Sequence, residues 1–154
     1  MLYPADIHID KSPCIVSTVL GSCVSICLHD PVLRHGTINH YILPNWNGKD
    51  LATLKYGDIA SIRILEELLR LGSNIENVTA KVYGGAEVLA GISTNFHIGK
   101  RNVQVAFEIL SEFGIPVLFS DVGGTKGRKI TFNTLTGDVD VDYIRSNDRA
   151  KVVT

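Results

Sequence analysis

The sequence predicts a mixed α/β (α+β) fold in which two main helices lie against a mixed β-sheet or sandwich. Short runs rich in β-branched residues, separated by turn-forming residues, indicate about eight strands. Two longer segments place apolar residues at helical spacing. The early strands follow one another as hairpins, whereas strand and helix alternate in the middle, which is typical of layered domains. With 154 residues, 45% of them hydrophobic, the chain is expected to form one domain spanning residues 1–154.

Four strands are expected in the first third of the chain, because β-branched residues are concentrated there. They cover residues 7–9, 14–20, 23–28 and 37–43. A Gly21-Ser22 break separates the second strand from the third. The third strand alternates between two kinds of side chain, with Val24, Ile26 and Leu28 on one side and Cys23, Ser25 and Cys27 on the other. This period of two predicts a half-buried strand.

The pairing of the third and fourth strands decides which side chains meet. If residues 31–34 form the loop and Asp30 pairs with His35, Cys23 and His40 become diagonal neighbours on one face of the hairpin. A slip of one residue would place them on opposite faces. The sequence leaves this register open.

Two helices are expected over residues 56–71 and 98–113, each followed by a glycine suited to a left-handed cap. Their expected buried stripes are Ile59, Ile62, Leu65, Leu68 and Leu69 in the first helix, and Val103, Phe107, Leu110 and Phe113 in the second. The remaining strands are expected at residues 77–83, 116–121, 130–133 and 139–144. Residues 86–96 follow no clear pattern, and the polar tail from Ser146 is expected to fray.

Composition narrows the functional classes. The formal net charge is −1, which gives no general electrostatic reason to bind nucleic acid or an anionic membrane. No apolar run reaches the roughly 20 residues that a membrane-spanning helix needs. Residues 1–6 do not resemble a signal peptide. The three cysteines, Cys14, Cys23 and Cys27, are an odd number, which favours reduced thiols in the cytoplasm over a disulfide framework.

Cys23 and His40 are the leading candidates for chemistry. A thiol becomes an effective nucleophile when a base or cation draws off its proton, and His40 is a base within reach under the register described above. Gly21 and Ser22 allow a sharp turn before the cysteine, and the backbone amides around them are expected to supply an oxyanion hole. A third group should orient the imidazole, and the candidates are Thr18, Ser17 and Asn39.

The ordinary alternative is that Cys23 only fills space in the core, because free cysteine is among the most buried residue types. Cys14 and Cys27 are expected to pack in this way. A tetrahedral metal site would need four converging ligands, for which the nearest set is Cys23, Cys27, His29 and His40. Their spacing matches no common zinc pattern, so no metal is expected.

Two glycine-rich segments, residues 84–86 and 123–128, match neither the phosphate-binding P-loop nor the dinucleotide-binding fingerprint. They are expected to form tight turns, or walls where a partner's backbone comes close. Lys100 and Arg101 stand at the start of the second helix, where the helix dipole disfavours positive charge. Such an inconsistency marks either a functional position or a solvated face.

Short motifs run in a specific order along nearly the whole chain, from about Ile15 to Tyr143. They are Leu20-Gly21-Ser22-Cys23-Val24, His40-Tyr41-Ile42-Leu43-Pro44, Lys55-Tyr56-Gly57-Asp58, Gly84-Gly85-Ala86, Ile98-Gly99-Lys100-Arg101-Asn102, Asp121-Val122-Gly123-Gly124, Gly127-Arg128 and Thr136-Gly137. In order and spacing they resemble the CheD family of chemoreceptor glutamine deamidases.

The resemblance implies a thiol hydrolase that needs no cofactor and has a layered fold similar to glutamine-deamidating bacterial toxins. The family cysteine falls on Cys23 and the family histidine on His40. The third family position is a threonine just before the nucleophile loop; Thr18 is its counterpart, and Ser17 remains the competing residue.

The implied substrates are glutamine side chains of methyl-accepting chemoreceptors in the cytoplasm, and the CheC phosphatase is a partner of some family members. A receptor helix would need an open groove, with residues 45–55 and the glycine-rich loops as its walls. The alternative is a binding module, which engages receptor or CheC without catalysis. Selective alkylation of Cys23 near neutral pH would favour the enzyme.

Overall fold

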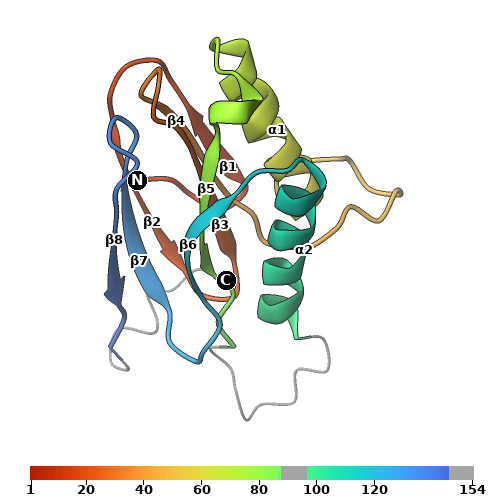
Figure 1. The fold of residues 1–154 in the computed structure, drawn as a ribbon. Helices are drawn as coiled ribbons and strands as arrows, with labels where there is room; N and C mark the ends of the chain where they lie inside the picture. Colours follow the sequence, from red (N-terminus) through yellow and green to blue (C-terminus); the bar gives the residue numbers. More distant parts are fainter. Residues whose placement is uncertain (88–96, 146–154) are drawn as a thin grey trace.

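The computed structural model describes residues 1–87 and 97–145 in three layers (Figure 1). Two helices form one outer layer, a five-stranded sheet forms the middle, and a three-stranded sheet forms the other outer layer. The mixed α/β fold predicted with two main helices is therefore confirmed. The segment 88–96, within the stretch that gave no clear pattern, and the tail 146–154 lie outside the described residues.

The middle sheet has the strand order β1-β4-β3-β5-β6. Its strands are β1 (Asp6–Ile9), β4 (His35–His40), β3 (Val24–Asp30), β5 (Thr79–Gly84) and β6 (Val117–Val122). All neighbours pair antiparallel except β5 and β6, which are parallel because helix α2 connects them. The outer sheet is antiparallel and consists of β2 (Ile15–Leu20), β7 (Arg128–Asn133) and β8 (Val139–Tyr143).

Helices α1 (Gly57–Arg70) and α2 (Ile98–Glu112) cover one face of the middle sheet, and a 3₁₀ turn at Ile75–Asn77 follows α1. None of the described helices is long and apolar enough to cross a bilayer. The layers enclose two apolar clusters. Helices and sheet share the first, which includes Val24, Ile26, Leu28, Ile64, Leu68 and Val82. The two sheets share the second, which includes Leu20, Cys23, Cys27, Ile38, Ile130 and Phe132.

Strand β3 departs from its predicted half-buried character, since six of its seven residues are buried. It lies at the centre of the middle sheet, with α1 and α2 over one face and β2, β7 and β8 over the other. Its cysteine-bearing side therefore faces the second sheet instead of solvent. Period-two alternation identifies the two faces of a strand, but it does not reveal that a second sheet covers the more polar face.

The buried faces of the two helices also differ from the predicted stripes. Ile62 in α1, and Phe107 and Phe113 in and after α2, keep 36–38% of their surface exposed. The buried positions include several small or polar residues, namely Gly57, Ala60 and Ser61 in α1 and Gly99, Asn102 and Ala106 in α2. A Cβ on Gly57 would lie 2.6 Å from the Tyr41 ring. Because the helices approach their neighbours this closely, small side chains occupy the contact and a purely apolar stripe misplaces it.

Glycines in the segment after β5 bring three backbones together. Gly84 and Gly85 have φ values of +109° and +70°, which side chains other than glycine's rarely adopt. A Cβ on Gly85 would overlap Val103 Cγ2 and lie 2.7 Å from the Gly99 carbonyl oxygen. The backbone of helix α2 therefore comes close to residues 84–86 within the same chain, whereas the expectation that a partner's backbone lies against them stays a prediction.

Gly85→Ala is expected to destabilise the fold more than Gly124→Ala, although both glycines have nearly the same φ, +70° and +73°. Each alanine incurs the left-handed backbone cost of about 1–2 kcal/mol. The alanine at position 85 also overlaps neighbouring atoms, which costs about 1–3 kcal/mol more. The alanine at position 124 does not, because nothing lies within 4 Å of a Cβ on Gly124. Free energies of unfolding from denaturant titration measure both values. Equal losses of unfolding free energy in the two variants would show that helix α2 does not contact Gly85 closely in solution.

Candidate active site

The two sheets meet around Cys23, His40 and Thr18. Asp30 pairs with His35, and the same register continues to an isolated bridge between Val24 and Tyr41. Of the registers that the sequence left open, the structure therefore has the one that places Cys23 and His40 on the same face, and both point toward the three-stranded sheet. Thr18 comes from that facing sheet, in β2. All three side chains are buried.

His40 occupies the last position of β4, where the chain leaves the sheet. The strand ends earlier than the sequence predicts because the N–H groups of Ile42 and Leu43 both bond to the carbonyl oxygen of Lys55, at 2.9 Å, instead of continuing the ladder. A side chain at the end of a buried strand is held rigidly on one side and adjoins a loop on the other. This is a common position for functional groups.

Among the three candidates for orienting the imidazole, Thr18 contacts it. The Thr18 hydroxyl lies 2.6 Å from His40 Nδ1. The Ser17 hydroxyl instead pairs with that of Thr131, at 3.2 Å. Asn39 points to the opposite face, where its Oδ1 accepts a hydrogen bond from the Ile26 N–H at 2.7 Å. The geometry favours Thr18 over Ser17 for the third position.

Burial sets the protonation of both reactive groups. It raises the pKa of the Cys23 thiol to about 12, although a hydrogen bond from the residue's own N–H partly opposes this. Burial also lowers the pKa of His40 to about 4. Within the described residues, His40 Nε2 is buried without a hydrogen-bond partner. At neutral pH the site therefore holds a protonated thiol and a neutral imidazole whose Nε2 makes no hydrogen bond to the described residues.

The loop of residues 21–23 is fixed through its carbonyl groups. The Gly21 oxygen accepts from the Ala86 N–H at 3.0 Å, and the Cys23 oxygen accepts from the Gly85 N–H at 2.9 Å. The Ser22 oxygen accepts from Asn102 Nδ2 at 2.9 Å. The N–H groups of these three residues donate to no other residue in the described part of the chain. Donors of this kind beside a buried thiol suit the oxyanion of a tetrahedral intermediate.

Sequence reasoning missed two residues that support this loop. Asn102 Nδ2 donates to the carbonyl of Ile42 as well as to that of Ser22, and so joins the loop of residues 21–23 to the chain after His40. Arg128 is buried and donates to the carbonyls of Gly84 and Gly123, at 2.9 Å each. Both residues stand in motifs that carry the family resemblance, and Asn102 also lies at the charged start of the second helix, but neither signal revealed which backbone groups these side chains would bind.

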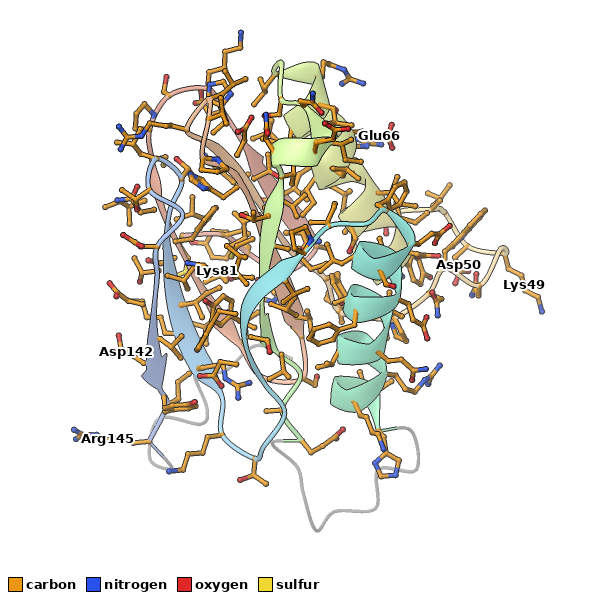
Figure 2. The ribbon with its side chains drawn as sticks, viewed as in Figure 1. Lys49, Asp50, Glu66, Lys81, Asp142 and Arg145 are labelled. Carbon is orange, nitrogen blue, oxygen red and sulfur yellow. The ribbon has the colours of Figure 1, made fainter. Side chains whose placement is uncertain are left out.

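The two glycine-rich segments adjoin the site, but the tip of the long loop does not. The Gly123 N–H donates to the Gly84 carbonyl and the Glu87 N–H to the Gly124 carbonyl, each at 2.9 Å. In Figure 2, Lys49 and Asp50 at the tip of the 45–55 loop project on the helix side, away from the three-stranded sheet. The sequence predicts an open groove at the site, whereas in the structure Cys23 has no exposed surface.

The residues considered as metal ligands do not converge. His29 Nε2 lies 3.0 Å from the Leu135 carbonyl, in a different region from His40. Across residues 1–87 and 97–145, no group of three or more His, Cys, Asp or Glu side chains is arranged to hold a metal ion.

The buried imidazole predicts a specific dependence of stability on pH. Because its folded pKa of about 4 lies below the ordinary 6.5, His40 stabilises the fold fully above pH 6.5 and progressively less as the pH falls toward 4. The shift corresponds to about 3 kcal/mol. The stability difference between the native chain and His40→Gln should shrink by about that amount over this range, as measured by denaturant unfolding at each pH. Parallel pH profiles would contradict the burial of a neutral imidazole.

Comparison with known proteins finds matches over most of the chain. A family model described as CheD chemotactic sensory transduction matches residues 42–143. A probable chemoreceptor glutamine deamidase CheD of Trichlorobacter lovleyi is 48% identical over 90% of this chain and 86% of its own. The chemoreceptor glutamine deamidase CheD of Thermotoga maritima is 36% identical over 92% of this chain and 90% of its own. These matches span nearly the whole chain, which therefore belongs to the CheD family.

Proposed function

We propose that this chain is a chemoreceptor glutamine deamidase that converts glutamine side chains to glutamate and releases ammonia. The relatives named for this activity align with nearly the entire chain. The observation that carries the proposal is the 2.6 Å contact between Thr18 and His40 Nδ1 across the two sheets. It orients an imidazole on the face that also bears Cys23, which is the arrangement a thiol hydrolase needs.

In the first half-reaction Cys23 Sγ attacks the carbon of the substrate carboxamide. The neutral imidazole of His40 accepts the thiol proton through Nε2, so a separate thiolate does not have to form first. The backbone N–H groups of residues 21–23 stabilise the oxyanion. The carbon–nitrogen bond then breaks, His40 returns the proton to the leaving nitrogen, and ammonia departs from a thioester.

Water completes the reaction. His40 Nε2 takes a proton from water as its oxygen attacks the thioester carbon, and the carbon–sulfur bond breaks. The proton passes to the departing sulfur, which restores the Cys23 thiol and leaves glutamate on the substrate. The cycle consumes one water and releases one ammonia, and it requires no cofactor.

Burial of the thiol has a consequence for how substrate enters. Since Cys23 is fully buried, a carboxamide reaches Sγ only after the surroundings of residues 21–23 move. We propose that docking of a methyl-accepting chemoreceptor supplies the energy for this opening, as induced fit does in other enzymes. The proposed setting is the cytoplasm, with residues 1–154 acting as one deamidase domain. The CheC phosphatase is a second proposed partner, which the family resemblance suggests.

The alternative function is a binding module that engages receptor or CheC without chemistry. The observation that favours it is that the Cys23 thiol is buried and protonated in the isolated chain. A binding module has no need of an oriented, neutral imidazole beside that thiol, however, and the Thr18–His40 contact favours the enzyme.

Cys23→Ala should abolish ammonia release from a receptor cytoplasmic fragment, because the nucleophile is lost. The matched control is Cys27→Ala, a second buried cysteine of the same cluster, which should retain activity. His40→Gln should lower the rate by about 10²–10⁴, the usual contribution of a general base. Mass spectrometry of receptor peptides measures conversion of glutamine to glutamate. Full activity in Cys23→Ala would refute the mechanism.

Alkylation of the isolated chain should modify Cys14 before Cys23. Cys14 is partly exposed, whereas Cys23 is buried and its pKa of about 12 leaves almost no thiolate at neutral pH. The sequence alone, read as that of a thiol enzyme, leads to the opposite expectation that Cys23 is alkylated first. A receptor fragment should accelerate labelling of Cys23 and leave that of Cys14 unchanged, as followed by peptide mapping over time. Under the binding-module alternative, Cys23 would stay unreactive with the receptor present.

A further inference from the structure

Residues 2–5 join the two sheets at the candidate site. The Leu2 N–H donates to the Ser17 carbonyl at 2.7 Å, which attaches this segment to the free edge of β2. The Ala5 N–H donates to the carbonyl of His40 at 2.8 Å, which attaches it to β4. Between them the chain turns at Ala5, whose φ of +64° is a left-handed conformation. The segment thus contacts the strand bearing Thr18 and the residue His40 itself.

The carbonyl of Leu2 also accepts the Thr18 hydroxyl, at 2.8 Å. A hydroxyl has one proton and a carbonyl oxygen has none, so the Thr18 proton lies on the side of Leu2. The other close contact of the same oxygen, to His40 Nδ1, must then use a proton from the imidazole. Neutral imidazole carries only one N–H, so Nε2 is left with its lone pair.

We propose that the main-chain carbonyl of Leu2 is a positioning group that holds His40 in the Nδ1–H tautomer. The chain of donors runs from His40 to Thr18 to Leu2, and it leaves Nε2 as the acceptor for the thiol proton. Without the Leu2 acceptor, the Thr18 hydroxyl is free to donate to Nδ1 and so to favour the Nε2–H tautomer, which cannot accept that proton. The catalytic consequence rests on the proposed deamidase function, whereas the tautomer does not.

The packing of Leu2 is suited to this role. Its side chain is buried in the cluster between the sheets, together with Leu20 and Cys23. The contacts of the Thr18 hydroxyl with the Leu2 carbonyl and with His40 Nδ1 are both buried, so water does not compete for the Leu2 carbonyl. The unfavourable conformation of Ala5 persists because both ends of the segment are bonded to the sheets, as is common for strained residues near functional sites.

The test weakens one acceptor and leaves every side chain in place. Replacing Tyr3 by its α-hydroxy acid turns the bond between residues 2 and 3 into an ester, whose carbonyl is a poorer acceptor than that of an amide. The Tyr3 N–H that is lost donates to no other described residue. The readouts are the ¹⁵N chemical shifts of the His40 ring and the kcat for deamidation of a receptor fragment.

The intact chain should show a protonated Nδ1 and an unprotonated Nε2. The ester should move part of the population to Nε2–H and lower kcat by roughly tenfold, the effect of weakening one hydrogen bond, with KM unchanged. The matched control is Leu2→Ala, which removes the buried side chain but keeps the carbonyl; it should lower stability and leave the tautomer unchanged. Thr18→Val should lose the Nδ1–H preference, and Thr18→Ser should keep it.

Two results would overturn the proposal: Nε2–H as the main tautomer of the intact chain, or an ester variant with unaltered ring shifts and kcat. The proposed function fails separately. A chain that has the Nδ1–H tautomer but converts no receptor glutamine would refute the deamidase and leave the role of Leu2 in the tautomer supported by the ring shifts.

Discussion

The packing of the three-stranded sheet on the five-stranded sheet is the constraint on which the rest of the molecule depends. It buries the cysteine-bearing face of β3, and it brings Thr18 of β2 against His40 of β4. The same contact removes water from the thiol and the imidazole, which explains why both are neutral at physiological pH. Fold stability and site chemistry therefore arise from one interface, and a change that loosens the sheets affects both.

Backbone contacts, more than side chains, define the candidate site. The carbonyls of residues 21–23 each accept a hydrogen bond from the 84–86 segment or from α2, so the peptide planes of this loop are fixed. Gly84, Gly85 and Gly99 permit this approach because a Cβ at any of them would meet neighbouring backbone. Asn102 completes the arrangement by donating to two partly buried carbonyls from one amide group. Buried carbonyls without such partners would cost about 1–3 kcal/mol each.

Most of the fold and the central pair of the site followed from local patterns in the sequence. The hairpin register could be proposed because Asp30-Pro31 and Gly36 limit the loop, and the strands before and after it are strongly β-branched. The covering of β3 by a second sheet could not be predicted, since it depends on contacts between residues more than 100 positions apart, as between His29 and Leu135. The helix faces were misplaced for a similar reason: Asn102 and Ser61 are buried by partners that lie far away in the sequence.

A cysteine kept as a buried thiol is also protected from damage. Oxidants attack thiolates, and oxidation beyond the sulfenic state is not repaired in most proteins. Cys23 has neither the charge nor the exposure that such reagents require. The tight contact of the two sheets therefore preserves the reactivity of a cysteine that a solvent-filled groove would leave open to oxidation and to unselective reaction.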